Sequence, residues 1–159
     1  MALFLKEHKK FLLLLAKHKV KFLLIGGYAV IYHGYERTTS DMDVWLKPTN
    51  KNRGRFISAL REHGVADDQL QIVNTMNFTK PQVVNIGRKP NQIEFLTKVT
   101  GLEFEEASAK KVTLDLEQYQ IGLLGYDDLI TNKMLTGRLQ DQADVETLRK
   151  IQRERNKNE

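Results

Sequence analysis

The chain has 159 residues, of which 41% are hydrophobic and 28% are charged, and it contains no cysteine. This length and composition are typical of one soluble globular domain with a real core, and they exclude a disordered chain. Without cysteine, neither a disulfide framework nor a thiolate metal site can form. We therefore expect a single domain over residues 1–159 in a reducing compartment.

The net charge of +5 is concentrated at the N-terminus. Residues 1–21 hold six lysines against one glutamate, whereas the rest of the chain holds 19 basic and 19 acidic residues. Such a segment forms either a patch for nucleic acid or another polyanion, or the solvated face of an amphipathic helix. We favour the second interpretation and predict a basic amphipathic helix at residues 1–19. Its apolar surface could contact a second copy of the chain, so a homodimer is one of the possible assemblies.

No part of the sequence is typical of a targeting or membrane segment. The apolar run Phe11–Ala16 is too short for a signal peptide, and lysines interrupt the residues after it. Nothing approaches the ~20 apolar residues of a membrane span. We therefore expect a cytoplasmic protein without a membrane partner.

Hydrophobic periodicity predicts alternating helices and strands in the first half of the chain. A glycine pair follows the first predicted strand, a single glycine closes the short second helix, and Pro48 ends the second strand. In chain order we expect a helix at Phe4–Leu15, a strand at Val20–Ile25, a helix at Tyr28–His33, a strand at Asp41–Leu46 and a helix at Asn52–His63.

The second half of the chain predicts two more strands, a hairpin and a final pair of helices. The expected elements are strands at Gln82–Ile86 and Gln92–Leu96, a short helix at Glu103–Lys110, a hairpin of Lys111–Leu114 and Tyr119–Ile121, and helices at Tyr126–Thr136 and Asp141–Arg153. This order favours an α/β (α+β) fold, in which helices flank a mixed central sheet and a helix pair at residues 125–155 ends the chain.

Two features in the first half of the chain suggest phosphate chemistry. Gly26 and Gly27 follow a strand and open a helix, where backbone N–H groups favour negative charge. Asp41 and Asp43 occupy alternate positions on a strand, so their side chains share one face and can hold Mg²⁺. Glu94 lies between large apolar residues on a later strand, where a charge is costly unless it is paired, metal-bound or facing a cleft.

Each feature alone has an ordinary structural explanation, but their order is more specific. The stretches IGGYAV at Ile25–Val30 and TTSDMDV at Thr38–Val44 resemble the glycine and carboxylate signatures of the nucleotidyltransferase superfamily, which includes DNA polymerase beta and the antibiotic nucleotidyltransferases. The segment HGYERTTSDMD at His33–Asp43 is more similar to small prokaryotic members related to abortive-infection and toxin–antitoxin nucleotidyltransferases. A later motif, from LITNK at Leu129–Lys133 to RLQDQAD at Arg138–Asp144, also resembles those proteins.

The resemblance implies a nucleotidyltransferase fold and the transfer of a nucleoside monophosphate from a nucleoside triphosphate to an acceptor hydroxyl. It implies Mg²⁺ or Mn²⁺ as the cofactor, and the acceptor, whether a small molecule, RNA or protein, stays open. The implied metal ligands are Asp41, Asp43 and Glu94, with Glu94 as the alternative base. The implied nucleotide- and phosphate-binding residues are Gly26, Gly27, Arg37, Thr39, Lys133 and Arg138.

The sequence departs from the superfamily pattern at two positions. Relatives often have serine at position 27 and lysine at position 140, where this chain has Gly27 and Gln140. Phosphate binding at the first position then depends on backbone N–H groups alone.

Several alternatives remain open. The chain can be a catalytically inactive module of the same fold that binds nucleotide, RNA or a protein partner, or the toxin of a pair whose partner is an antitoxin. A generic α/β domain that binds nucleic acid through its basic N-terminus would leave the aspartates unexplained. Among single residues, Lys133 and Arg138 can be solvated, Arg37 can pair with an aspartate, and Asp141 and Asp144 can stabilise a helix start.

Overall fold

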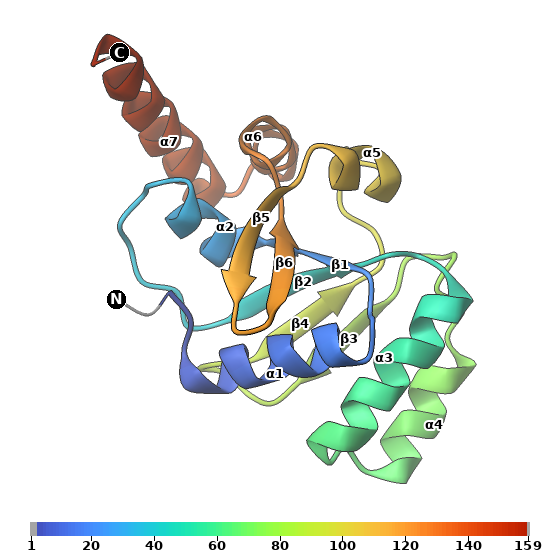
Figure 1. Ribbon diagram of the computed structural model, residues 1–159. Coiled ribbons are helices and arrows are strands. Elements are labelled where there is room, and N and C mark those ends of the chain that lie inside the picture. Colours follow the sequence, from blue (N-terminus) through green and yellow to red (C-terminus); the bar gives the residue numbers. More distant parts are fainter. Residues whose placement is uncertain (1–2, 159) are drawn as a thin grey trace.

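The computed structural model describes residues 3–158 and contains a six-stranded sheet with helices on both faces (Figure 1). The helices of this described part are α1 (Lys6–Lys17), α2 (Gly26–Tyr32), α3 (Asn50–His63), α4 (Asp67–Thr75), α5 (Phe104–Ala109), α6 (Tyr126–Thr136) and α7 (Leu139–Lys157). The strands are β1 (Phe22–Ile25), β2 (Met42–Leu46), β3 (Val83–Ile86), β4 (Ile93–Leu96), β5 (Val112–Leu116) and β6 (Tyr119–Leu123).

The sheet is mixed, as predicted, with the strand order β3-β4-β2-β1-β6-β5. β1 pairs antiparallel with β2 and parallel with β6, and β2 pairs parallel with β4. Antiparallel β3 and β5 form the two edges. This topology places β1 and β2 at the centre, so the segments that carry the glycine pair and the aspartates adjoin the most buried strands.

Aromatic side chains attach helices to both faces of the sheet. On one face, Phe11 of α1 and Phe56 of α3 both contact Phe95 of β4, with ring centroids 5.3 and 4.6 Å away. On the other face, Trp45 of β2 meets Phe104 of α5 edge to face at 5.2 Å. The core therefore lies on two sides of the sheet, and Trp45 belongs to it, because only 1% of its surface is exposed.

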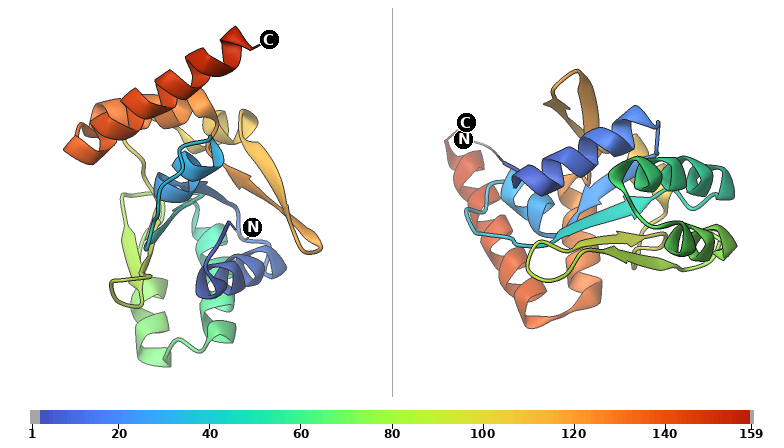
Figure 2. Two further views of the ribbon diagram at one scale, coloured as in Figure 1. Left: turned by 90° about the vertical axis from the view of Figure 1, so that its left-hand side faces the viewer. Right: turned by 90° about the horizontal axis from the view of Figure 1, so that it is seen from below.

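The α3–α4 and α6–α7 pairs lie at opposite ends of the molecule (Figure 2). The C-terminal part of α7 extends beyond the body of the protein (Figures 1 and 2). α2 contacts β1, β2 and α6, so it joins the central strands to the C-terminal helix pair. Segments far apart in the sequence thus meet at the end of the sheet where β1 finishes.

All of the predicted helices and strands are present, with small shifts at their ends. The glycine pair forms the first turn of α2 rather than a turn before it. Helix α4 was not predicted, because it buries only Leu70 and Val73 and has no side chain capping its N-terminus. Its apolar face is too narrow to stand out as a periodic pattern.

The N-terminal basic helix is observed as α1, and the part of the prediction at residues 1–2 lies outside the described residues. Its apolar face is buried within the chain, since His8, Phe11, Leu12 and Leu15 belong to the interior. The same face is thus not available for a second copy. None of the helices among residues 3–158 has the length and apolar character needed to cross a membrane.

Candidate active site

The register of the central strands places two predicted carboxylates side by side. Asp43 of β2 pairs with Glu94 of parallel β4, and Ile25 of β1 flanks Asp43 on the other side. Paired residues on neighbouring strands point to the same face, and such strands are about 4.8 Å apart. Asp41 joins them, because its Oδ1 accepts a hydrogen bond from the backbone N–H of Gln92 at 3.0 Å. Three carboxylates therefore gather at one end of the sheet.

A cleft of about 430 Å³ opens over these carboxylates. Residues of α6 and α7 and of the segment after β4 supply its other walls. The predicted site residues that line it are Gly26, Asp41, Asp43, Glu94, Lys133 and Arg138. The remaining three predicted residues, Gly27, Arg37 and Thr39, are not among its lining residues.

Two further cations, Lys89 and Lys98, line the same cleft. They lie on either side of β4 in the sequence, each within five positions of Glu94. Neither lysine was predicted as a site residue, because isolated lysines in loops carry no periodic or motif signal. Their proximity to Glu94 along the chain is the one signal that could have selected them.

The carboxyl group of Asp43 is strongly affected by its surroundings. Burial raises the pKa of Asp43, the charges of Glu94 and Asp41 raise it further, and Arg138 and Lys133 only partly oppose them, leaving it at about 6. A carboxyl that is held close to two others and out of water lacks a sufficient positive partner. The cleft therefore contains negative charge that a bound cation can neutralise.

Gly26 is required at its position by both backbone and space. It has φ +66°, in the left-handed region, where a side chain is strained. A Cβ atom there would also overlap with the carboxylate of Asp43. The close approach brings the start of α2 directly against the carboxylate wall of the cleft.

Gly27 is packed against the segment that precedes β2. A Cβ atom at Gly27 would lie 2.5 Å from Oγ1 of Thr39, inside van der Waals contact. The Thr39 hydroxyl also donates a hydrogen bond to the backbone carbonyl of Asp41 at 3.0 Å. Thr39 therefore holds the aspartate segment against α2, and in this structure it positions the site without lining the cleft.

The opposite wall of the cleft is a buried network of ion pairs. Nζ of Lys133 lies 3.2 Å from Asp141 and 2.9 Å from Asp144, and only 5% of Lys133 is exposed. Arg37 pairs with Asp144 through Nε at 3.2 Å, and Arg138 pairs with Asp141 through Nε at 2.8 Å. This network joins α6, α7 and the segment before β2.

Asp141 and Asp144 do more than stabilise the start of α7, which was their simplest interpretation. Both are buried, with 1% and 0% of their surfaces exposed. Burial alone would raise the pKa of Asp141, but hydrogen bonds from Arg138, Thr136 and Lys133 lower it to about 2. The signal that could have identified them is their spacing of three residues on one helix face, close after Lys133 in the sequence.

Arg138 differs from Lys133 in its exposure. Its side chain is 77% exposed, although it holds Asp141 with Nε and Nη2. The hydrogen bond and charge of Asp141 raise its pKa, and the charges of Asp43 and Glu94 raise it further. The guanidinium of Arg138 is therefore anchored at one edge while it remains accessible to a ligand in the cleft.

The donor atoms of the carboxylate wall fit a hard divalent cation, because all of them are oxygens. Among residues 3–158, no group of three or more histidine, aspartate or glutamate side chains is close enough to hold a metal ion by itself. Mg²⁺ typically takes one or two carboxylates together with substrate phosphates. The wall thus fits an ion that binds with a phosphate ligand. The observation that supports this fit is the β2–β4 register, which sets Asp43 beside Glu94 at a cleft that Asp41 also lines.

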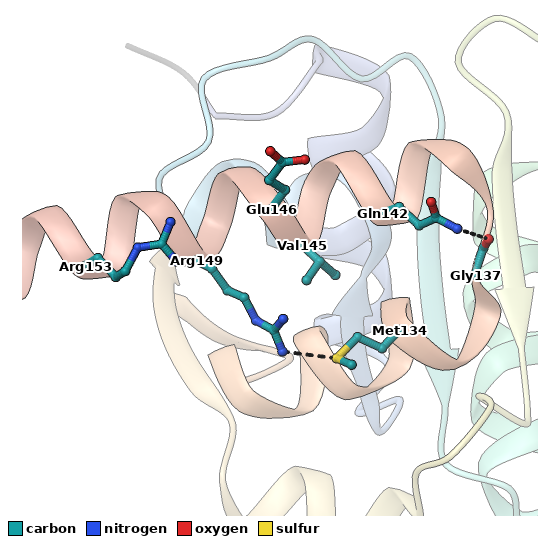
Figure 3. Close-up of a pocket in the computed structure, with 7 residues that line it drawn as sticks. All are labelled: Met134, Gly137, Gln142, Val145, Glu146, Arg149 and Arg153. Atoms are coloured by element: carbon teal, nitrogen blue, oxygen red, sulfur yellow. Dashed lines mark hydrogen bonds between the residues drawn. The ribbon is translucent and has the colours of Figure 1, made fainter.

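A second hollow, of about 470 Å³, lies between α6 and α7 (Figure 3). In Figure 3 the guanidinium of Arg149 reaches Sδ of Met134 at 3.2 Å, and the amide of Gln142 donates to the carbonyl of Gly137 at 3.0 Å. Gly137 lies in the α6–α7 turn, between Thr136 and Arg138, which line the carboxylate cleft. The turn therefore has a polar cleft on one side and a more apolar groove on the other.

The protein is similar in structure to the lincosamide antibiotic adenylyltransferase LnuA, whose crystal structure contains lincomycin. The TM-score is 0.51 at 13% sequence identity, over 91% of this chain and 97% of that chain. The chain has a nucleotidyltransferase fold. This confirms the fold class predicted from the glycine and aspartate signatures. No protein-family model matches the chain, and no curated protein matches it.

Proposed function

We propose that the protein is a divalent-metal-dependent nucleotidyltransferase, which transfers a nucleoside monophosphate from a nucleoside triphosphate to an acceptor hydroxyl. The observation that carries this proposal is a single cleft with Asp41, Asp43 and Glu94 on one wall and Lys133 and Arg138 on the other. Metal-assisted phosphoryl chemistry needs both kinds of charge, since the ion and the phosphates bring opposite signs. The nucleotidyltransferase fold supports the same assignment.

In this proposal Asp41 and Asp43 hold Mg²⁺ or Mn²⁺, and Glu94 either completes the ligand set or accepts the proton of the acceptor hydroxyl. When bound, the ion supplies charge neutralisation on the triphosphate and lowers the pKa of the attacking hydroxyl. The hydrogen bond from Gln92 to Asp41 fixes one carboxylate before any ligand enters. The adjacent β2–β4 register fixes Asp43 and Glu94.

The cationic wall binds the triphosphate in two different ways. Arg138 offers an exposed planar guanidinium, suited to paired phosphate contacts. Lys133 is held by two aspartates and supplies a fixed positive charge at the cleft surface. Backbone N–H groups at Gly26 and Gly27 contribute from the start of α2. Arg37 and Thr39 act behind the cleft, as residues that position the others.

The acceptor is a small molecule, an RNA or a protein side chain that carries a hydroxyl. LnuA is described as acting on lincosamide antibiotics, and that substrate is a property of LnuA. The resemblance to toxin–antitoxin nucleotidyltransferases adds the proposal of a toxin with an antitoxin partner. Growth arrest on expression of the wild-type chain, absent for an Asp43→Asn variant and relieved by a neighbouring gene product, would support that role.

The decisive experiment compares Asp43→Asn with Asp67→Asn, a matched control on the exposed surface of α4. Each variant is incubated with each nucleoside triphosphate, Mg²⁺ and the small-molecule, RNA and protein fractions of a cell extract, and products are identified by mass. We expect Asp43→Asn to lower the transfer rate by about 1,000-fold or more, because a metal ligand is lost, and the control to stay within about twofold. Equal rates in the wild type and Asp43→Asn would refute the assignment.

Calorimetry separates this enzyme from an inactive module of the same fold. We expect triphosphate binding to the wild type to strengthen when Mg²⁺ is added and to lose that dependence in Asp43→Asn. Metal-independent binding without any product would instead favour the inactive module.

A further inference from the structure

A second charged cleft lies at the opposite end of β1 from the carboxylates. It has a volume of about 640 Å³, and none of its lining residues lines the carboxylate cleft. The C-terminal end of β1 leads to the carboxylates through Gly26, whereas Phe22 at its N-terminal end lines this second cleft. The charged residues in its lining are Lys19, Lys21, Lys47, Arg55, Lys111 and Glu105.

These residues concentrate positive charge. Five basic residues against one acidic residue give the lining a net charge of +4, compared with +5 for the whole chain. The acidic residue, Glu105, is paired with Lys47 at 2.8 Å. Among the described residues, none of the other four basic side chains of the lining has an ion-pair partner, and Arg55 donates only to the backbone carbonyl of Lys19, at 3.3 Å.

The rest of the N-terminal positive charge is partly neutralised elsewhere. Lys9 of α1 is paired with Glu117 at 2.6 Å, and Lys17 is paired with Glu62 at 2.8 Å. Of the six N-terminal lysines, only Lys19 and Lys21 line this cleft. Lys47 after β2, Lys111 directly before β5 and Arg55 of α3 supply its other positive charges.

Three aromatic residues line the same cleft, namely Phe22, Phe104 and Tyr119, and Phe104 is buried. Phe22 and Tyr119 are only half-buried, so each keeps an exposed part that a ligand in the cleft can reach. Proteins bind single-stranded nucleic acid by combining a cationic groove for the backbone with aromatic rings on which bases stack. The cations surround a concave space rather than forming a flat surface. This shape favours a single strand of nucleic acid over a membrane surface as the ligand.

We propose that this second cleft binds a single strand of nucleic acid, with its phosphates on Lys19, Lys21, Arg55 and Lys111 and with bases against Phe22 and Tyr119. The shared chemistry is a phosphate backbone with unpaired bases, which RNA and DNA strands both offer. Because the cleft shares no lining residue with the carboxylate site, the proposal stands whether or not nucleotide transfer is confirmed.

The test measures the binding of fluorescent oligonucleotides of about 12 nucleotides to the full chain by anisotropy, without triphosphate. We expect Lys21→Glu combined with Lys111→Glu to weaken binding by about tenfold or more, because two phosphate contacts are reversed. The control is Lys150→Glu combined with Lys157→Glu on exposed parts of α7, which also lowers the net charge by four. This control should change affinity by less than about threefold.

Two further measurements check the mode of binding. With four phosphates neutralised, raising the salt from 50 to 200 mM should weaken wild-type binding by roughly 50-fold, since the slope is about −0.7 per phosphate for single strands. Tyr119→Ala keeps every charge and should cost about fivefold or more in affinity through lost stacking. Circular dichroism establishes that each variant is folded.

Several outcomes would overturn the proposal. Equal losses in the cleft variant and the α7 control would mean that only net charge matters. Binding to vesicles of anionic lipid but not to oligonucleotides would assign the surface to membranes. Inorganic triphosphate that binds as tightly as the strand would make this a small-anion site. Parallel measurements with RNA and DNA oligonucleotides identify which nucleic acid binds more tightly, and tighter binding of either one supports the proposal.

Discussion

The two walls of the carboxylate cleft use aspartate in opposite ways. On the sheet wall, Asp43 is crowded by Glu94 and Asp41, and its pKa rises to about 6. On the helix wall, Asp141 is buried among hydrogen-bond donors, and its pKa falls to about 2. The same side chain is thus left without a sufficient positive partner in one place and fully satisfied in the other.

This difference distinguishes carboxylates that can bind a ligand from carboxylates that hold the structure around the cleft. Carboxylates that already have cations around them hold structure together, as Asp144 does with Arg37 and Lys133. Carboxylates that the fold brings together with too little positive charge beside them carry a cost that a ligand can remove. The unpaired wall therefore provides the functional signal, and the paired wall fixes the cations that face it.

The largest expected effect concerns the paired wall. Asp144→Ala should lower the free energy of unfolding by about 3 kcal/mol, because Arg37 loses its carboxylate partner and buried Lys133 keeps only Asp141. Urea denaturation measures this change, and Asp67→Ala on the exposed surface of α4 should stay within about 1 kcal/mol, because it removes only a favourable charge at the start of that helix. A loss below about 1 kcal/mol for Asp144→Ala would remove the distinction between the two walls.

A matched pair of substitutions should produce effects of opposite sign. At pH 8, with a chelator present, Asp141→Asn should cost about 2 kcal/mol of stability, because a strongly bonded carboxylate is lost. Asp43→Asn should instead stabilise the protein by about 1 kcal/mol, a value discounted because part of Asp43 remains exposed to solvent. Thermal and urea unfolding of both variants test the prediction, and a destabilised Asp43→Asn would contradict it.

The smallest expected effect is on the pH dependence of stability. Its direction should be opposite in chelator and with bound Mg²⁺ and triphosphate. Since the folded pKa of Asp43 is above its ordinary value of 3.8, the folded protein binds an extra proton between about pH 4 and pH 6. In chelator, this group's contribution to stability is complete below that window and is lost as the pH rises through 6. Metal binding requires the ionised carboxylate, so Mg²⁺ with triphosphate should stabilise the protein at pH 7.5. The apparent affinity for Mg²⁺ with triphosphate should be about tenfold weaker at pH 5.

Thermal midpoints measured across this pH range, with and without Mg²⁺, provide the test. Asp43→Asn should remove both the chelator profile and the metal response. A metal response that is constant from pH 5 to 7.5 would show that another group controls binding.

Much of the fold could be predicted because its signals are local. The apolar run of β1, the alternation in β2 and the caps of the helices each fall within a few residues, and together they imply a mixed sheet. α4 escaped because it buries only two apolar side chains. Gly26, Asp41 and Asp43 could be selected because they belong to one short segment, while Glu94 needed the parallel β2–β4 pairing to become their neighbour.

The features that escaped prediction depend on tertiary contacts. Asp141 and Asp144 look like helix-start residues in the sequence, and only the packing of α6 on α7 shows that they hold Lys133. The second cleft is assembled from segments that lie between positions 16 and 122. Charges that meet only after folding leave no pattern along the chain.

The contact between Gly27 and Thr39 has a consequence for comparing this chain with others. The hydroxyl of Thr39 fills the space that a side chain at position 27 would enter. A serine at position 27 and a threonine at position 39 would therefore compete for the same space. An alignment that scores position 27 alone records a missing hydroxyl, whereas the folded chain shows that Thr39 leaves no room for a side chain there.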